Sequence, residues 1–305
     1  MKDLSKYHGI VPAFYACYDD QGEISPDRTA RFARYLVDKG VQGLYVGGSS
    51  GECIYQSVAD RKTTLEAVME AVGDQITIIA HVACNNTRDS RELAAHAESL
   101  GVDAIAAIPP IYFRLPEASI ARYWNEISAA APNTDFFIYN IPQLAGVALT
   151  PSLYETMLHN PKVVGVKNSS MPVQDIQIFK ALGGDDHLVY NGPDEQLVSG
   201  LAIGADGGIG GTYAAMPELY LAILQHVQAG KLEEAREIQY EANRIIELLV
   251  SGEGHMYAVI KAVLEKMSGL ELGSVRSPLA PCTSRDEALI EQCVEAIEAA
   301  VARIS

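Results

Sequence analysis

Apolar and polar residues follow two alternating patterns over the first 229 positions, one typical of buried strands and one typical of amphipathic helices. Short apolar runs predict strands at 9–14, 41–46, 76–82, 104–108, 135–139, 163–167, 187–190 and 207–211. Apolar residues three and four positions apart predict helices at 29–39, 58–72, 87–100, 116–130, 151–159, 173–182, 195–203 and 217–229. Ser25 and Thr150, each followed by proline, are expected N-caps, and Thr87 is the expected cap of the third helix.

Eight strand–helix units are the number that closes a parallel barrel, so we predict an α/β fold of the (β/α)8 TIM barrel type. A weak internal repeat supports this fold, because Gly40, Gly101 and Gly204 each stand between a helix end and a strand start. An open doubly wound sheet is the alternative. That fold usually carries a G-x-G-x-x-G turn after its first strand, and residues 9–22 contain none.

The alternation stops after residue 229, and three helices are predicted in the remainder of the chain. The first is amphipathic at 232–250, the second is apolar at 256–266, and the third follows a capping box from Ser284 to Glu287 and runs to about 304. We therefore predict a barrel with the active site at 1–229 and a C-terminal helical extension at 230–305, packed on the barrel. The extension is too small to be an independent catalytic unit.

Composition narrows the classes of partner. The net charge is −16, which disfavours binding to the phosphate backbone of nucleic acids. Five cysteines without CxxC spacing argue against a zinc site and against a disulfide framework, and they fit a reducing cytoplasm. No apolar run approaches the ~20 residues of a membrane span. No apolar stretch follows the first six residues, so we expect no signal peptide.

Residues 163–167 combine a buried strand with a lysine at its end. Val163, Val164, Gly165 and Val166 fit a strand that is buried on both faces, and Lys167 follows them directly. Burial disfavours the charged ammonium and favours the neutral amine, which is a nucleophile for Schiff-base chemistry with carbonyl substrates. The alternative is a lysine whose ammonium reaches the surface from the strand end.

Chemically useful residues stand at the ends of other strands, where barrels of this class build their active sites. The second strand ends in the glycine- and serine-rich segment 47–52, whose amides and hydroxyls suit a carboxylate because no lysine or arginine lies in it. The fourth and fifth strands are followed by Tyr112 and Tyr139, and the seventh by Asp194 and Glu195. Each feature alone has a purely structural explanation. Their presence on one rim around a lysine favours an active site.

The motifs at these strand ends resemble the N-acetylneuraminate lyase and dihydrodipicolinate synthase family of class I, Schiff-base aldolases. The resemblance covers residues 9–215 well and the helical tail only in general pattern. The matching motifs are 47–52, 139–142, 165–167 and 207–210. It implies a homotetramer built from two dimers and an enzyme without metal or cofactor, because the protonated imine is itself the electron sink.

The resemblance also implies residue roles. Lys167 would form the imine with the keto carbon of pyruvate or a sugar acid, and Tyr139 would relay the proton during carbon–carbon cleavage. Ser49, Ser50 and nearby amides, such as that of Gly48, would hold the pyruvate carboxylate. Tyr112 would extend into the neighbouring subunit's site and tune the proton relay there.

The same resemblance bears on the substrate. Dihydrodipicolinate synthases carry an arginine shortly after the Tyr-Asn-x-Pro motif, whereas 143–147 contains no cation. The lyases carry Gly-x-Asp-Glu for a polyol chain, which matches Gly192-Pro193-Asp194-Glu195. They also carry a hydroxyl residue at the position of Ser169. Gly211 stands where they usually have serine.

Reversible cleavage of N-acetylneuraminate to N-acetylmannosamine and pyruvate is therefore expected. The alternatives are a dihydrodipicolinate synthase-like reaction, a 2-keto-3-deoxy-sugar-acid aldolase, and a non-catalytic pyruvate-binding protein.

Overall fold

A computed structural model describes residues 3–304 of the chain. The first six residues carry the prediction that no signal peptide is present. Two of them, Met1 and Lys2, lie outside the described residues. None of the described helices is both long enough and apolar enough to cross a membrane.

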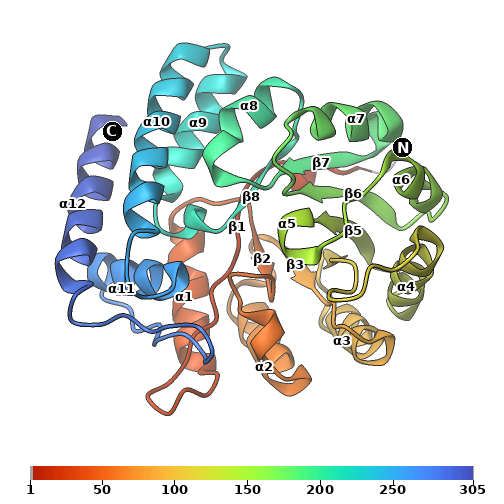
Figure 1. The fold of residues 1–305 in the computed structure, drawn as a ribbon, viewed down its shortest axis with the longest axis horizontal. Coiled ribbons are helices and arrows are strands. Elements are labelled where there is room, and N and C mark those ends of the chain that lie inside the picture. Colours follow the sequence, from red (N-terminus) through yellow and green to blue (C-terminus); the bar gives the residue numbers. More distant parts are fainter. Residues whose placement is uncertain (1–2, 305) are drawn as a thin grey trace.

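Eight parallel strands form a closed barrel, which confirms the predicted fold (Figure 1). The strands are β1 Gly9–Pro12, β2 Gly43–Val46, β3 Thr77–His81, β4 Ala104–Ala107, β5 Asp135–Asn140, β6 Val163–Asn168, β7 Leu188–Asn191 and β8 Gly207–Gly210. Strands β2 to β8 pair in chain order, and β1 pairs with β8. A parallel bridge between Ala13 and Tyr45 joins the end of β1 to β2 and closes the ring.

The outer helices surround the barrel in the predicted order. They are α1 Pro26–Asp38, α2 Val58–Val72, α3 Thr87–Leu100, α4 Glu117–Ala130, α6 Pro151–Leu158, α7 Gln174–Gly183, α8 Leu197–Ala202 and α9 Pro217–Gln228. Ser25 and Thr150 cap their helices as predicted. The prediction for α3 was wrong by one residue. Asn86 has extended backbone and accepts a hydrogen bond from the Asp89 amide at 2.8 Å, whereas Thr87 is already helical.

A short helix, α5 Pro142–Ala145, follows β5 and was not predicted. It occupies the loop after the Tyr-Asn-x-Pro motif, where Pro142 provides the fixed φ of a first helical residue and Gly146 ends the turn in the left-handed conformation. This turn brings the segment 143–147 to the carboxyl end of the barrel.

The C-terminal extension forms α10 Leu232–Leu249, α11 Met256–Ser268 and α12 Glu287–Ile304 (Figure 1). Helix α10 packs against α8 and α9, and α12 packs against α9, α10 and α11. The expected capping box from Ser284 is replaced by Asp286. The carboxylate of Asp286 accepts hydrogen bonds from the backbone amides of Thr283 and Glu253, both at 2.7 Å, so it ties the start of α12 to the loop between α10 and α11.

Buried residues form two main layers. Aromatic and aliphatic side chains fill the interior of the barrel, including Tyr45, Phe137 and Tyr190. A larger cluster lies between the strands and the helices and continues into the extension. In β6, a Cβ on Gly165 would lie 2.3 Å from the carbonyl oxygen of Leu188, so only glycine permits the close approach of the strand that carries Lys167.

Candidate active site

A pocket of about 250 Å³ opens at the carboxyl ends of the strands. Nine of the residues predicted from the sequence line it: Ser49, Ser50, Tyr139, Lys167, Ser169, Gly192, Asp194, Glu195 and Gly211. These residues come from β5, β6 and four separate loops, so only the closed barrel brings them together.

Lys167 lies on the inner wall of this pocket and is only 4% exposed. In the sheet its Cα is paired with those of Tyr139 on β5 and Tyr190 on β7. Its Nζ stands 4.0 Å from the centroid of the Tyr139 ring and 4.4 Å from that of the Tyr45 ring. The amine is therefore held between two aromatic faces and presented to the pocket, instead of reaching the surface.

Tyr139 belongs to an aromatic group beneath the pocket. Its ring packs edge-on against Tyr45 and His81, with centroids 5.7 and 6.0 Å apart. Burial, together with the positive charge of Arg61, holds the pKa of His81 well below its ordinary value. His81 is therefore neutral, and its Nδ1 lies 2.9 Å from the carbonyl oxygen of Gly47, a partner that can only accept. This contact fixes the start of the 47–52 loop.

The two serines of the 47–52 loop face the pocket, with Ser50 the more deeply buried. The hydroxyl of Ser50 interacts with the phenols of Tyr15 and Tyr257. Tyr15 in turn donates to the carbonyl oxygen of Gly211 at 3.0 Å. A Cβ on Gly211 would lie 3.2 Å from Ser50 Oγ, so glycine leaves room at this point where a serine would stand close to the Ser50 hydroxyl.

Asp194 is a buried residue of the pocket lining, and burial raises the pKa of its carboxyl to about 6. One carboxylate oxygen, Oδ2, is already engaged, because it accepts from the Thr212 amide at 2.7 Å and from Thr212 Oγ1 at 2.6 Å. Only the other oxygen is available to a ligand. The exposed side chain of Glu195 lines the pocket beside it.

Helix α10 supports the Asp194–Glu195 turn from behind. Gln239 is buried and donates to the carbonyl oxygen of Asp194 at 3.0 Å. Asn243, one turn further along the helix, donates to the carbonyl oxygen of Glu195 at 3.1 Å. The extension thus fixes the position of both acidic residues.

Ser169 and Gly192 meet at the ends of β6 and β7. A Cβ on Gly192 would lie 2.0 Å from Ser169 Oγ, so glycine is required for the serine hydroxyl to face the pocket. Leu144 on α5 and Met171 also line the pocket, and they are 65% and 62% exposed. The mouth of the pocket therefore carries two exposed apolar side chains, and α5 provides no cation there.

Two predicted site residues are not among the described residues that line this pocket. Gly48 packs beneath the loop, where a Cβ would lie 2.7 Å from the Tyr45 ring. Tyr112 is 89% exposed, with a left-handed backbone (φ 84°), and its ring packs edge-on against Phe113 at 5.0 Å.

Sequence reasoning missed several residues of the pocket. Thr212 lies just after β8, and the sequence did not predict its hydrogen bond to Asp194. The extension contributes Ile246, Met256 and Tyr257, although the sequence predicted only an amphipathic and an apolar helix there. An aromatic residue in the first turn of an apolar helix gives no periodic signal that distinguishes a pocket wall from a core position.

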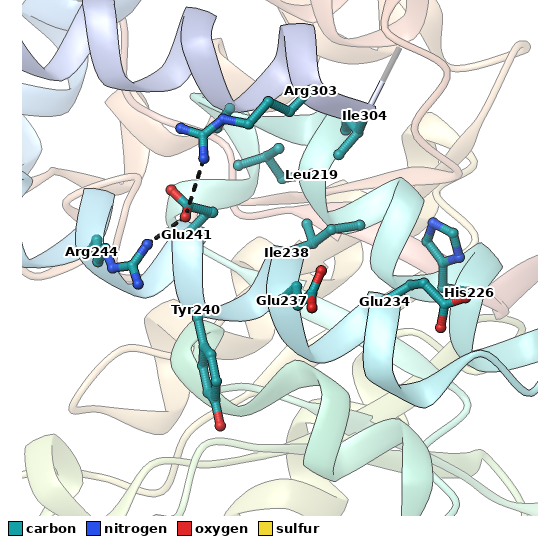
Figure 2. Close-up of a pocket in the computed structure, with 11 residues that line it drawn as sticks. Leu219, His226, Glu234, Glu237, Ile238, Tyr240, Glu241, Arg244, Arg303 and Ile304 are labelled. Carbon is teal, nitrogen blue, oxygen red and sulfur yellow. Dashed lines mark hydrogen bonds and ion pairs between the residues drawn. The ribbon is translucent and has the colours of Figure 1, made fainter.

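A second cavity, of about 470 Å³, lies between α9, α10 and α12 (Figure 2). It contains none of the predicted site residues, and three glutamates and two arginines line it. Arg244 and Arg303 both pair with Glu241 at its edge (Figure 2). Within residues 3–304, no group of three or more His, Cys, Asp or Glu side chains could hold a metal ion.

A parallel barrel with a buried lysine on its sixth strand, facing hydroxyl groups at the strand ends, defines the class of Schiff-base aldolases. The chain belongs to the dihydrodipicolinate synthetase family, whose sequence model matches residues 6–297.

Individual proteins and solved structures within this family are similar to the chain. The chain is 62% identical over 297 residues to a protein named N-acetylneuraminate lyase from Mediterraneibacter gnavus, covering 97% of this chain and 94% of the relative. A solved structure of wild-type Ruminococcus gnavus sialic acid aldolase superimposes with a TM-score of 0.97 at 61% identity, covering 98% of this chain and all of the other. A Clostridium difficile protein solved in complex with mannosamine gives a TM-score of 0.90 at 29% identity, covering 96% and 99% of the two chains.

Proposed function

We propose that this protein is a class I aldolase that reversibly cleaves N-acetylneuraminate to N-acetylmannosamine and pyruvate. The observation that carries the proposal is the buried amine of Lys167, held 4.0 Å from the Tyr139 ring centroid at the wall of a pocket rich in hydroxyl groups. The 62% identical relative named N-acetylneuraminate lyase supports the substrate. A solved relative described as a sialic acid aldolase catalytic lysine mutant, 60% identical to this chain, supports the role of a lysine.

The covalent steps follow from the chemistry of an amine and a keto acid. Lys167 Nζ adds to the keto carbon of the open-chain sugar acid, and loss of water gives a protonated imine. The Tyr139 phenol relays the proton of the hydroxyl on the second carbon from the imine carbon, accepting it as its own proton passes to the substrate carboxylate. The bond between that hydroxyl-bearing carbon and the carbon next to the imine breaks, and its electron pair moves into the imine to give an enamine. The aldehyde N-acetylmannosamine leaves. Protonation of the enamine carbon and hydrolysis then release pyruvate and the free lysine, without a metal or cofactor.

The remaining pocket residues would bind the two ends of the substrate. Ser49, Ser50 and the amides of the 47–52 loop are placed to hold the carboxylate. Ser169, the free oxygen of Asp194 and the Glu195 carboxylate are placed to accept hydrogen bonds from the polyol chain. The pKa of about 6 means that the Asp194 carboxyl is mainly ionised, and thus an acceptor, above that pH.

The pocket disfavours the synthase alternative. A substrate with a second carboxylate needs a cation near α5, and the residues there that line the pocket are Gln143 and Leu144. Burying an unpaired substrate carboxylate there would cost several kcal/mol of binding free energy. A 2-keto-3-deoxy-sugar acid is the second candidate, because Gly211 removes a hydroxyl that a longer chain would use.

We expect the purified enzyme to release pyruvate from N-acetylneuraminate with a kcat/KM at least ~100-fold above that for 2-keto-3-deoxygluconate. It should show no condensation of pyruvate with aspartate semialdehyde. Coupling to lactate dehydrogenase measures the pyruvate released from each sugar acid. Loss of aspartate semialdehyde measures the condensation. A preference for either competitor would overturn the substrate assignment and leave the imine mechanism standing. Pyruvate binding without turnover of any sugar acid would indicate a non-catalytic protein.

We propose further that the enzyme is a cytoplasmic homotetramer in which Tyr112 reaches the site of a neighbouring subunit. Five free cysteines fit a reducing compartment. Tyr112 and Phe113 are 89% and 71% exposed in the single chain, and two adjacent exposed aromatic rings are typical of a surface covered by a partner.

Light scattering at assay concentration should accordingly give the mass of four chains. The Tyr112→Phe variant should remain tetrameric and lose roughly tenfold in kcat, because it keeps the ring and loses only the hydroxyl. An enzyme that is fully active as a monomer would contradict the cross-subunit role of Tyr112.

A further inference from the structure

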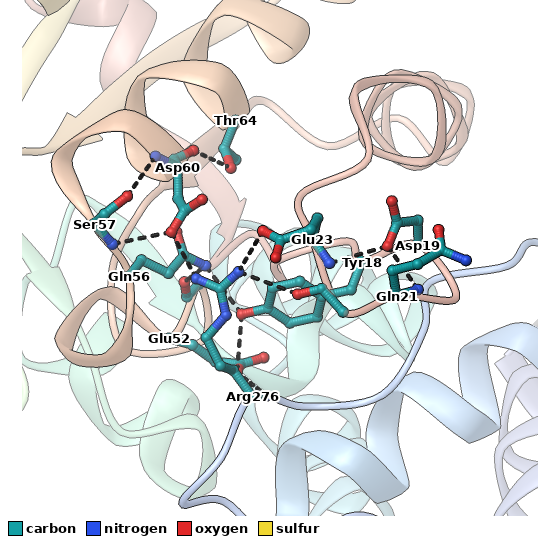
Figure 3. Close-up of polar contacts among 12 residues, drawn as sticks. Tyr18, Asp19, Gln21, Glu23, Glu52, Gln56, Ser57, Asp60, Thr64 and Arg276 are labelled. Atoms are coloured by element: carbon teal, nitrogen blue, oxygen red, sulfur yellow. Dashed lines mark hydrogen bonds and ion pairs between the residues drawn. The ribbon is translucent and has the colours of Figure 1, made fainter.

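Glu52 ends the loop that carries Ser49 and Ser50, but its side chain joins a polar network outside the pocket lining (Figure 3). It is one of two described non-glycine residues with positive φ, at 55°. Its carboxylate is fully buried, and Oε2 accepts hydrogen bonds from the Tyr18 hydroxyl at 3.1 Å and the Arg276 amide at 2.7 Å. A strained backbone of this kind persists only where its surroundings fix it.

The counter-charge for Glu52 comes from the C-terminal extension. Lys261 on α11 is 1% exposed, and its Nζ lies 3.7 Å from Glu52 Oε1, an oxygen without a hydrogen-bond partner among the described residues. The same amine donates to the carbonyl oxygen of Ser274 and lies 4.5 Å from the centroid of the Tyr18 ring. Two opposite charges buried together interact more strongly than they would in water, and either one alone is costly.

Arg276 connects the same point to the barrel. Its Nη1 pairs with Asp60 in the first turn of α2 at 2.6 Å, and its guanidinium lies 5.0 Å from the Tyr18 ring centroid (Figure 3). Gln56 donates to the carbonyl oxygen of Gly51 at 2.8 Å and to the Tyr18 hydroxyl at 3.1 Å. The loop end is therefore held from both sides, by α2 and by the extension.

The position of Glu52 also sets that of the serines. The Glu52 amide donates to the carbonyl oxygen of Ser49 at 2.9 Å, which closes a turn around Ser50. A shift of the Glu52 backbone would therefore move both hydroxyls relative to Lys167. Displacements of about 1 Å in a binding group are enough to weaken a site by one or two orders of magnitude.

We propose that Glu52 and Lys261 are a buried positioning pair through which the C-terminal extension holds Ser49 and Ser50 in the geometry that binds the substrate carboxylate. This inference rests on the proposed function, because it assigns a role in binding the keto acid at the same site. A positioning pair differs from an ordinary stabilising ion pair, because its loss should raise the KM for pyruvate and leave the KM for N-acetylmannosamine nearly unchanged.

The test uses Glu52→Gln, Lys261→Met and the double variant in the full chain. The concentration of pyruvate that half-saturates borohydride trapping, and the KM for pyruvate in condensation, should each rise about tenfold in the single variants. The KM for N-acetylmannosamine should change less than twofold. The double variant should recover part of the loss, because it leaves no unpaired buried charge. Glu218→Gln is the matched control, since it removes a partly buried ion pair with Lys39 at 2.5 Å, between α9 and the end of α1.

A Glu52→Gln enzyme that folds, as judged by circular dichroism, and keeps the wild-type half-saturation for pyruvate would overturn the inference. So would a loss of active enzyme at unchanged KM values, because that pattern is expected from destabilisation alone. If the wild-type protein itself traps no pyruvate, the proposed function fails instead. The two failures are therefore distinguishable.

Discussion

Replacing Lys167 with alanine is expected to lower kcat for pyruvate release at least ~10³-fold and to abolish covalent trapping, because no other amine among the pocket-lining residues can form the imine. In the wild-type enzyme, pyruvate with borohydride should add the mass of a reduced pyruvyl group to the peptide that contains Lys167. Peptide mass spectrometry detects this added mass in the wild-type enzyme and its absence in the Lys167→Ala variant.

Lys39→Ala provides the control for this experiment, since Lys39 pairs with Glu218 away from the pocket and its loss should leave trapping unchanged. Full labelling of the Lys167→Ala variant would show that another amine carries the chemistry. A labelled peptide that lacks Lys167 in the wild-type digest would lead to the same conclusion.

The Tyr139→Phe variant should lose about 10²- to 10⁴-fold in kcat, the usual range for removal of a positioned proton-transfer group. The ring, whose centroid lies 4.0 Å from Lys167 Nζ, remains, so imine formation with pyruvate should persist. Single-turnover trapping and steady-state cleavage, measured on the same preparation, separate the two steps.

Tyr154→Phe is the matched control for Tyr139→Phe. Tyr154 is fully buried on α6, outside the pocket lining, and its hydroxyl has no hydrogen-bond partner among the described residues. Its removal should leave kcat within about twofold. If Tyr139→Phe retains comparable activity, the proton passes through another group, and the Tyr257 hydroxyl near Ser50 would be the next candidate.

The barrel could be predicted from the sequence because local patterns determine it. Strands and helices alternate with clear periods, and glycines mark the helix ends. The strand-end rule then placed Lys167, Tyr139 and the 47–52 loop on one rim, because in a closed parallel barrel all strands end on the same side.

The remaining features depend on contacts between distant segments. The pairing of Glu52 with Lys261 joins positions more than 200 residues apart, and no periodicity reveals it. Likewise, Asp194 appears in the sequence as a free acceptor, whereas Thr212 occupies one of its oxygens. The cap of α3 differs for a local reason, since both Asn86 and Thr87 are suitable N-cap types and the backbone selects the first.

The order in which the pocket is assembled has a consequence for biosynthesis. The groups that hold its two ends, Gln239 behind Asp194 and Lys261 beside Glu52, come from helices translated after all eight strands. A nascent barrel emerging from the ribosome can therefore close its ring before its ligand-binding loops are fixed. Competence to bind the keto acid should arise late in translation, after α11 has left the exit tunnel and docked.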